Sequence, residues 1–372
     1  LPRRLAAEQA KSSGAYDEAI SHLEAVFRLL PEETIEATVV LVDLGHVQTR
    51  RGHSVKAQAT YRRAFDMARR NGWADVAARA ALGYEESLHQ PGAPGAPATR
   101  MVSEAILMIG DRQQPLRARL QASLTRSLYH SGDTEGAREA GAIAMTMARA
   151  VGDDECIVAA LQAITIIAGD PSRLLEASTE LRDVAMSIGD SWSAAYATGN
   201  MFRALLEVGR LGEAGQILEQ HRTMSDRGRF LVFQYMSLVY EAVLALAAGR
   251  FDDAEQAAER AHAVGESSNT VFDAGVYGLQ MFAIRREQGR LAEVLPLMRV
   301  LSSRQDDQSV WRPGLTALYA QIGMLDEARH ELDALAPGGF AAVARDSVWP
   351  ACLTFLAEAC IACAAEEHAD VL

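Results

Sequence analysis

Apolar positions recur at helical spacing through most of the chain, with polar and charged positions between them. The clearest case is Ser54–Arg70, where a serine can cap the start and Asn71-Gly72 can close the end. No alternating run of Val, Ile and Thr between turn residues predicts a strand. The pattern therefore predicts an all-α fold. Further helix ends are indicated at Val151-Gly152-Asp153, Ile188-Gly189-Asp190 and Val264-Gly265.

Glycines punctuate the chain at intervals of 34 to 40 residues. Most are followed five residues later by alanine, as at Ala57 and Ala137, and four residues further by a larger side chain, as at Tyr61. A turn glycine, a small contact residue and a larger neighbour are typical of the paired helices of tetratricopeptide repeats. The repeat glycines are Gly14, Gly52, Gly92, Gly132, Gly169, Gly209, Gly249, Gly289 and Gly323.

These intervals predict a tetratricopeptide-like, right-handed superhelical solenoid of about nine antiparallel helix pairs, forming a single repeat domain over residues 1–372. The segment 90–98, QPGAPGAPA, is rich in proline and glycine and interrupts the predicted helices. Because the regular spacing of the repeat glycines continues through this segment, we expect an expanded loop inside one helix pair rather than a domain boundary. A second loop, Pro337-Gly338-Gly339, is expected before a last helix from about Ser347.

Composition narrows the range of partners and chemistry. The chain has 36 basic and 49 acidic residues, a net charge of −13, which argues against binding to nucleic acid or to an anionic membrane surface. Its only lysines, Lys11 and Lys56, do not follow a glycine, so the phosphate-binding motif G-x-x-x-x-G-K-[ST] is excluded. The longest weakly polar run, Cys156–Gly169, is shorter than the roughly 20 residues of a membrane span and is expected to be a buried helix.

Four cysteines are too few for a disulfide framework, which favours a cytoplasmic compartment. Cys360 and Cys363, with Cys352 and His368 nearby, could form a metal or redox site, but their spacing is equally that of a packed helix face, and we expect packing, with no metal and no cofactor. No nucleophile elbow or zinc-protease spacing occurs. Second helices of the pairs are expected to carry His22, His221 and His262 at their polar edges.

Five strings in chain order resemble the tetratricopeptide-like region of large bacterial signal-transduction ATPases. These ATPases are LuxR-type transcriptional activators and adenylyl cyclases with an AAA-type ATPase module. One departure is Glu85-Glu86, where small glycines are expected in that family. The strings are Val42–Tyr84, Pro115–Asp133, Ala245–Ala261, Gln288–Leu301 and Gly338–Cys360.

The resemblance implies a non-catalytic, regulatory arm that binds an effector or partner. Nucleotide-binding and catalytic modules would then precede Leu1, and the chain, which does not begin with Met, would be a fragment of a longer protein. A LuxR-type regulator is the first hypothesis. The alternatives are the repeat region of an adenylyl cyclase and a stand-alone peptide-binding adaptor.

Ligands are expected in a concave groove lined by the first helix of each pair. The groove candidates include six arginines and four acids, the reverse of the whole chain, which hints at an acidic peptide or a small anionic effector. Solvated or paired charges are the alternative explanation. Protein or peptide partners are expected, and self-association stays open. The predicted ligand-binding residues are Arg119, Arg126, Tyr129, His130, Asn200, Arg203 and Tyr240, and the wider set of candidates adds Asp43, His46, Thr49, Arg50, Arg79, Glu86, His89, Ser123, Glu207, Gln280, Arg286 and Glu287.

Overall fold

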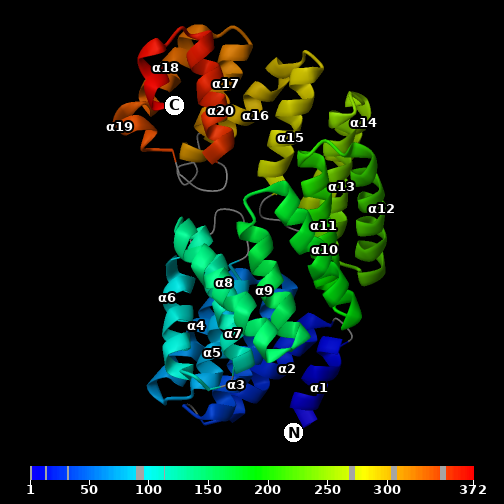
Figure 1. Ribbon diagram of the computed structural model, residues 1–372, viewed down its shortest axis with the longest axis vertical. Coiled ribbons are helices and arrows are strands. Elements are labelled where there is room, and N and C mark those ends of the chain that lie inside the picture. The colour runs from blue at the N-terminus through cyan, green and yellow to red at the C-terminus, as the bar shows by residue number, and fades with distance from the viewer. Residues whose placement is uncertain are drawn as a thin grey trace. The chain divides into compact units, whose positions relative to one another are not determined.

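The computed structural model describes residues 2–12, 15–31, 33–88, 96–112, 114–267, 273–302, 308–343 and 349–372. Helices α1 to α20 and two short 3-10 helices follow one another along this part of the chain, and it contains no strand (Figure 1). The chain divides into two compact units, Leu1–Ala204 and Leu205–Leu372, which we describe separately.

Unit 1 is a series of helices in which, from α1 to α10, each helix packs on the next one along the chain. The first helices of successive pairs also touch directly, since α3 contacts α5, α5 contacts α7 and α7 contacts α9. Helix α11 continues to Glu207, past the end of the unit. The bounds are α1 Pro2–Ser12, α2 Tyr16–Leu29, α3 Ile35–Arg51, α4 Ser54–Arg70, α5 Ala74–Glu86, α6 Ala96–Ile109, α7 Gln114–His130, α8 Thr134–Val151, α9 Asp154–Ile167, α10 Pro171–Ser187 and α11 Ser191–Glu207.

The repeat glycines act as predicted, as turn residues between paired helices. Gly52 ends α3 with φ 87°, a left-handed conformation that costs other residues free energy, and its amide donates to the last carbonyls of the helix. Gly14 and Gly92 lie outside the described residues. The other repeat glycines, all with positive φ, are Gly132, Gly169, Gly209, Gly249, Gly289 and Gly323.

The small and large residues that follow the glycines form the contacts between helices. Ala57 and Ala137 are fully buried. The ring of Tyr61, on α4, lies against two glycines of its neighbours: a Cβ atom added to Gly45 on α3 or Gly83 on α5 would come within 2.8 and 2.3 Å of that ring. The ring of this second-helix residue thus fits between two first helices.

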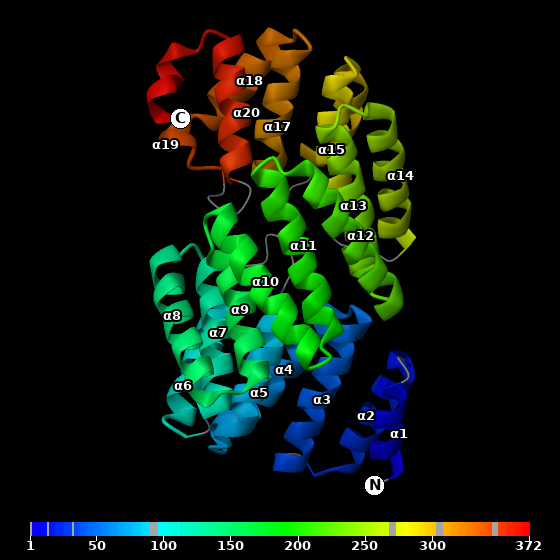
Figure 2. The ribbon, with the colours of Figure 1, turned by 45° about the vertical axis from the view of Figure 1, so that its right-hand side comes forward.

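Unit 2 repeats the pairing, and Figure 2 shows α13 beside α14 and α17 beside α18. Its cores are apolar, with Leu318, Leu332 and Leu356 fully buried. The bounds are α12 Leu211–Gly228, α13 Leu231–Ala247, α14 Phe251–Ser267, α15 Asp273–Glu287, η1 Leu291–Val294, α16 Leu295–Ser302, α17 Gln308–Gln321, α18 Leu325–Leu335, α19 Pro337–Phe340, α20 Trp349–Ala362 and η2 Glu366–Val371.

Three local predictions need correction. Ser54 does not cap α4, because the N-cap position belongs to His53, which makes no side-chain capping bond. Gly265 does not end α14, which continues to Ser267. The predicted loop 90–98 extends too far, because α6 already begins at Ala96. Residues 90–95 of that loop lie outside the described residues.

No helix in the part of the chain that the structure describes is both long and apolar enough to cross a membrane. The predicted single domain over 1–372 stays a prediction.

Candidate functional site

A buried ion pair joins two first helices of unit 1, α5 and α7. The Arg126 guanidinium on α7 donates through Nε to both carboxylate oxygens of Glu85 on α5, at 3.1 Å each, and the Ser123 hydroxyl donates to Glu85 Oε2 at 3.0 Å. The Glu85 side chain is 3% exposed and that of Arg126 is 11% exposed. Burial opposes the charge on Arg126, but the Glu85 carboxylate outweighs it and raises the pKa of the guanidinium.

Further polar side chains surround this pair. Glu86 on α5 and Tyr196 on α11 both interact electrostatically with Arg126, and the Tyr196 hydroxyl lies 3.4 Å from Thr165 Oγ1 on α9. Glu86 in turn has a second cationic neighbour, because Arg50 of α3 lies 3.9 Å from it. The Arg50 guanidinium carbon also lies 5.3 Å from the ring centroid of Trp192, so α3 and α11 meet here.

Two titratable groups border the pair Arg50 and Glu86. Burial lowers the pKa of His46 on α3, with Glu86 acting in the opposite direction. Burial also raises the pKa of the Tyr61 hydroxyl above its ordinary value, and Glu86 adds to that shift. At neutral pH both side chains are therefore uncharged.

We call this group the polar cluster of unit 1. Helices α3, α5, α7, α9 and α11, which alternate along the chain, all contribute to it. Its charged members are partly neutralised internally, and none of the interactions described above sets up a nucleophile or a general base. Its members are His46, Arg50, Glu85, Glu86, Ser123, Arg126, Thr165, Trp192 and Tyr196.

The predicted ligand-binding residues occupy different environments. Arg126 is buried in its pair with Glu85 and is a structural element of the cluster. Arg119 and Arg203 are exposed, and Arg119 has a loose contact of 3.9 Å with Glu155.

The remaining predicted residues are aromatic or amide side chains. The rings of Tyr129 and His130, at the end of α7, contact each other edge to face at 5.7 Å. The side-chain amide nitrogen of Asn200 is buried and has no hydrogen-bond partner among the described residues. Tyr240 belongs to unit 2, where its ring lies 5.4 Å from that of His221. The structure therefore brings Arg126 into the polar cluster and places Tyr240 in the other unit.

Sequence reasoning missed the importance of Glu85, which it noted only as a departure from the family pattern. The signal was available: Glu85 lies 41 positions before Arg126 and 38 before Ser123, close to one repeat interval. Residues one repeat apart on successive first helices are expected to be neighbours. Trp192 and Tyr196 carried no such signal.

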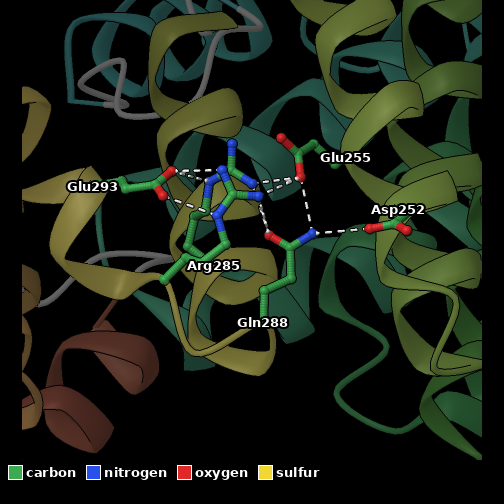
Figure 3. A network of polar contacts seen from close by, with 6 residues as sticks. Asp252, Glu255, Arg285, Gln288 and Glu293 are labelled. Carbon is green, nitrogen blue, oxygen red and sulfur yellow. Dashed lines mark hydrogen bonds and ion pairs between the residues drawn. The ribbon is translucent and has the colours of Figure 1, made fainter.

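A second polar network, in unit 2, joins α14, α15 and η1 (Figure 3). Arg285, 9% exposed, pairs with Glu255 on α14 and with Glu293 on η1. Gln288 contacts Glu255 and Asp252 at 2.9 and 3.5 Å. The hydrogen bonds from Arg285 and Gln288 lower the pKa of Glu255. Every member has an internal partner, so this network fastens helices together.

The C-terminal titratable groups are also engaged internally. Burial raises the pKa of Cys360 and Cys363, which contribute to the apolar core of this end of the chain. Near them Asp333, Glu367 and His368 lie close enough together to hold a metal ion. Arg329 pairs with Asp333 and with Glu367, so its guanidinium already supplies a positive charge beside these two carboxylates. The prediction that the chain holds no metal stays a prediction.

The predicted position of His221 at the polar edge of its helix is wrong. Its side chain is 1% exposed, and its Nδ1 lies 2.8 Å from the Ser237 hydroxyl. Because that hydroxyl donates to the Phe233 carbonyl at 2.9 Å, it accepts from His221 Nδ1–H. Burial lowers the pKa of His221 to about 4.

No protein-family model and no curated protein matches the sequence. Several solved structures share its fold. A Rap protein complexed with Competence and Sporulation Factor is 10% identical, with a TM-score of 0.59 over 100% of this chain and 98% of that chain. The apo form of RapI is 11% identical, with a TM-score of 0.56 over 90% of this chain and 97% of that chain.

A Signal Transduction ATPase with Numerous Domains, a protein with a tetratricopeptide repeat sensor from Pyrococcus horikoshii, is 11% identical, with a TM-score of 0.58. The match covers 92% of this chain but only 54% of that chain, so the chain spans about half the length of the ATPase. These likenesses show the fold, an all-α, tetratricopeptide-like solenoid of sequential antiparallel helix pairs, as the sequence predicted.

Proposed function

We propose that the chain is a non-catalytic regulatory repeat domain that binds a peptide or protein segment and controls a bacterial signalling ATPase of the LuxR-type regulator class. The polar cluster of unit 1 is the observation that carries the proposal. Five alternate helices deliver side chains to one place, and a solenoid uses such successive first helices as an extended binding surface. A segment lying along them would contact several repeats at once.

The likeness to the sensor-bearing ATPase supports the attachment to an ATPase, because the match covers about half of that protein. A second candidate is a stand-alone regulator. It is favoured by the match to the Rap protein bound to Competence and Sporulation Factor, which covers nearly the whole of that chain. In both cases the chain recognises a partner rather than transforming a substrate.

Binding is tested with fluorescein-labelled peptides of one apolar framework carrying glutamate, glutamine or lysine at the same positions, titrated with the full chain in an anisotropy assay. We expect the glutamate series to bind best. Because Arg119 and Arg203 are the exposed arginines of the predicted set, the double change Arg119→Ala and Arg203→Ala should weaken binding about tenfold.

Arg138→Ala is the matched control, since Arg138 is exposed on the second helix α8 and pairs with Glu135 of the same helix. Equal binding by the parent and the double variant would contradict the predicted role of Arg119 and Arg203 in binding. Hydrolysis of ATP or synthesis of a cyclic nucleotide by the chain alone would contradict the non-catalytic role.

The regulatory role needs the natural full-length protein. If an ATPase module precedes the repeats, a peptide that binds the chain should change the rate of ATP hydrolysis by the full-length protein, and the double variant should lose that response. A hydrolysis rate that ignores a bound peptide would favour the stand-alone regulator.

A further inference from the structure

Arg50 differs from the other arginines around the polar cluster. Its side chain is 35% exposed, and its ion-pair partner Glu86 lies 3.9 Å away, beyond hydrogen-bonding distance. Among the described residues none accepts a hydrogen bond from its guanidinium. Its neighbour Arg51, in contrast, donates through Nε to both oxygens of Asp17 at 3.0 and 3.1 Å. Arg126 is likewise occupied by Glu85.

Trp192 holds the guanidinium of Arg50 from one side. The ring centroid lies 5.3 Å from the guanidinium carbon, within the range of a cation–π contact. Such a contact is an electrostatic attraction to the ring and uses no carboxylate or carbonyl acceptor, whereas the guanidinium carries five N–H donors. The donors of Arg50 therefore keep their capacity for a bidentate acceptor, and the ring limits the orientations that the guanidinium adopts.

The surroundings favour a carboxylate as that acceptor. His46 is kept uncharged by burial, and Arg126 is neutralised by Glu85, so neither offers an open positive charge beside Arg50. Glu86 is the competing anion, but its carboxylate stands at 3.9 Å and is 44% exposed. A ligand carboxylate in direct contact with the guanidinium would make shorter, charge-assisted hydrogen bonds than Glu86 does.

We propose that Arg50, held against Trp192, receives a carboxylate of the bound peptide, either an acidic side chain or the C-terminal carboxylate. This inference rests on the proposed peptide-binding function and assigns the group that the peptide must carry. Binding places the carboxylate in the plane of the guanidinium and displaces Glu86 from its loose contact. Trp192 lies beside the bound carboxylate, so its fluorescence reports the event.

The test measures the dissociation constants of three peptides: the glutamate peptide with an amidated C-terminus, its glutamine counterpart with a free C-terminus, and the glutamine counterpart with an amidated C-terminus. The first two separate the two sources of carboxylate, and the third lacks both. We expect Arg50→Gln to weaken binding of the preferred carboxylate peptide by about 10- to 100-fold. Glu86→Gln should strengthen it several-fold by removing the competitor.

Arg51→Gln is the matched control, because Arg51 is adjacent in sequence, exposed and already paired with Asp17. Its peptide affinity should equal that of the parent. Circular dichroism melting of each variant shows whether the fold is retained. Peptide binding that is unchanged by Arg50→Gln, or equal for all three peptides, overturns this inference and leaves the proposed function standing. Failure of every peptide to bind the parent chain overturns both.

Discussion

At the scale of single residues, two buried serines of unit 1 differ in whether the hydroxyl has a partner. Ser178 and Ser123 are both fully buried, but the Ser178 hydroxyl has no hydrogen-bond partner among the described residues, whereas Ser123 donates to Glu85. A buried hydroxyl without a partner costs free energy, and alanine also favours a helix.

We therefore expect Ser178→Ala to raise the free energy of unfolding by about 1 kcal/mol and Ser123→Ala to lower it by about 2 kcal/mol. Urea unfolding followed by circular dichroism measures both changes. A loss of stability in Ser178→Ala as large as that in Ser123→Ala would contradict this account of the two hydroxyls.

His221 gives the chain a dependence of stability on acid pH. Its pKa of about 4 in the folded protein lies below the ordinary value of 6.5 because of burial. Between these pH values the unfolded chain binds a proton at this position and the folded chain does not, so folding loses stability as the pH falls from 6.5 toward 4. The full loss is about 3 kcal/mol, reached below pH 4.

The variant His221→Gln removes this titration, so its free energy of unfolding should fall less steeply than that of the parent across this pH range. Urea unfolding at pH 7, 6, 5 and 4.5 measures the difference. Parallel pH profiles for the two proteins would show that His221 does not titrate as described.

At the scale of helices, the ion pair of Arg126 and Glu85 joins α7 to α5. Removing one partner leaves the other charge buried and unpaired, whereas replacing both with apolar residues of similar size removes the charges together. We expect Glu85→Leu to lower the free energy of unfolding by about 3 to 5 kcal/mol, and the double change Glu85→Leu with Arg126→Met to recover most of that loss. Guanidinium unfolding of the parent, both single variants and the double variant completes the cycle. Losses that simply add would mean that the two charges do not stabilise each other.

The helices themselves were predictable because their signals are local. A left-handed glycine such as Gly52 and a fully buried alanine such as Ala57 are fixed by the turn and by the close contact of two helices. Gly265 shows the limit, since a glycine is also tolerated inside a helix at a cost of about 1 kcal/mol. The polar cluster was only half predictable: the repeat interval aligns Glu85 with Arg126, but the contact of Arg50 with Trp192 depends on how far the stack of helices turns.

At the scale of the whole molecule, the negative charge is unevenly shared. Unit 1 has 22 basic and 25 acidic residues, whereas unit 2 has 14 basic and 24 acidic residues. Most of the net charge of −13 therefore belongs to unit 2. Electrostatic repulsion of an anionic partner is therefore expected mainly from unit 2. The smaller negative charge of unit 1 is consistent with a carboxylate ligand at its polar cluster.

The same division decides how the molecule unfolds. Repeat proteins are held by contacts between neighbouring repeats, so two compact units can lose structure at different temperatures. Glu85→Leu weakens unit 1, and Leu332→Ala, at a fully buried core position, weakens unit 2 by about 2 to 5 kcal/mol. In differential scanning calorimetry we expect two overlapping transitions, one lowered by Glu85→Leu alone and the other by Leu332→Ala alone. If the heat absorption were a single transition with equal calorimetric and van't Hoff enthalpies, lowered by either variant, the 372 residues would unfold as the one cooperative domain that the glycine repeat predicts.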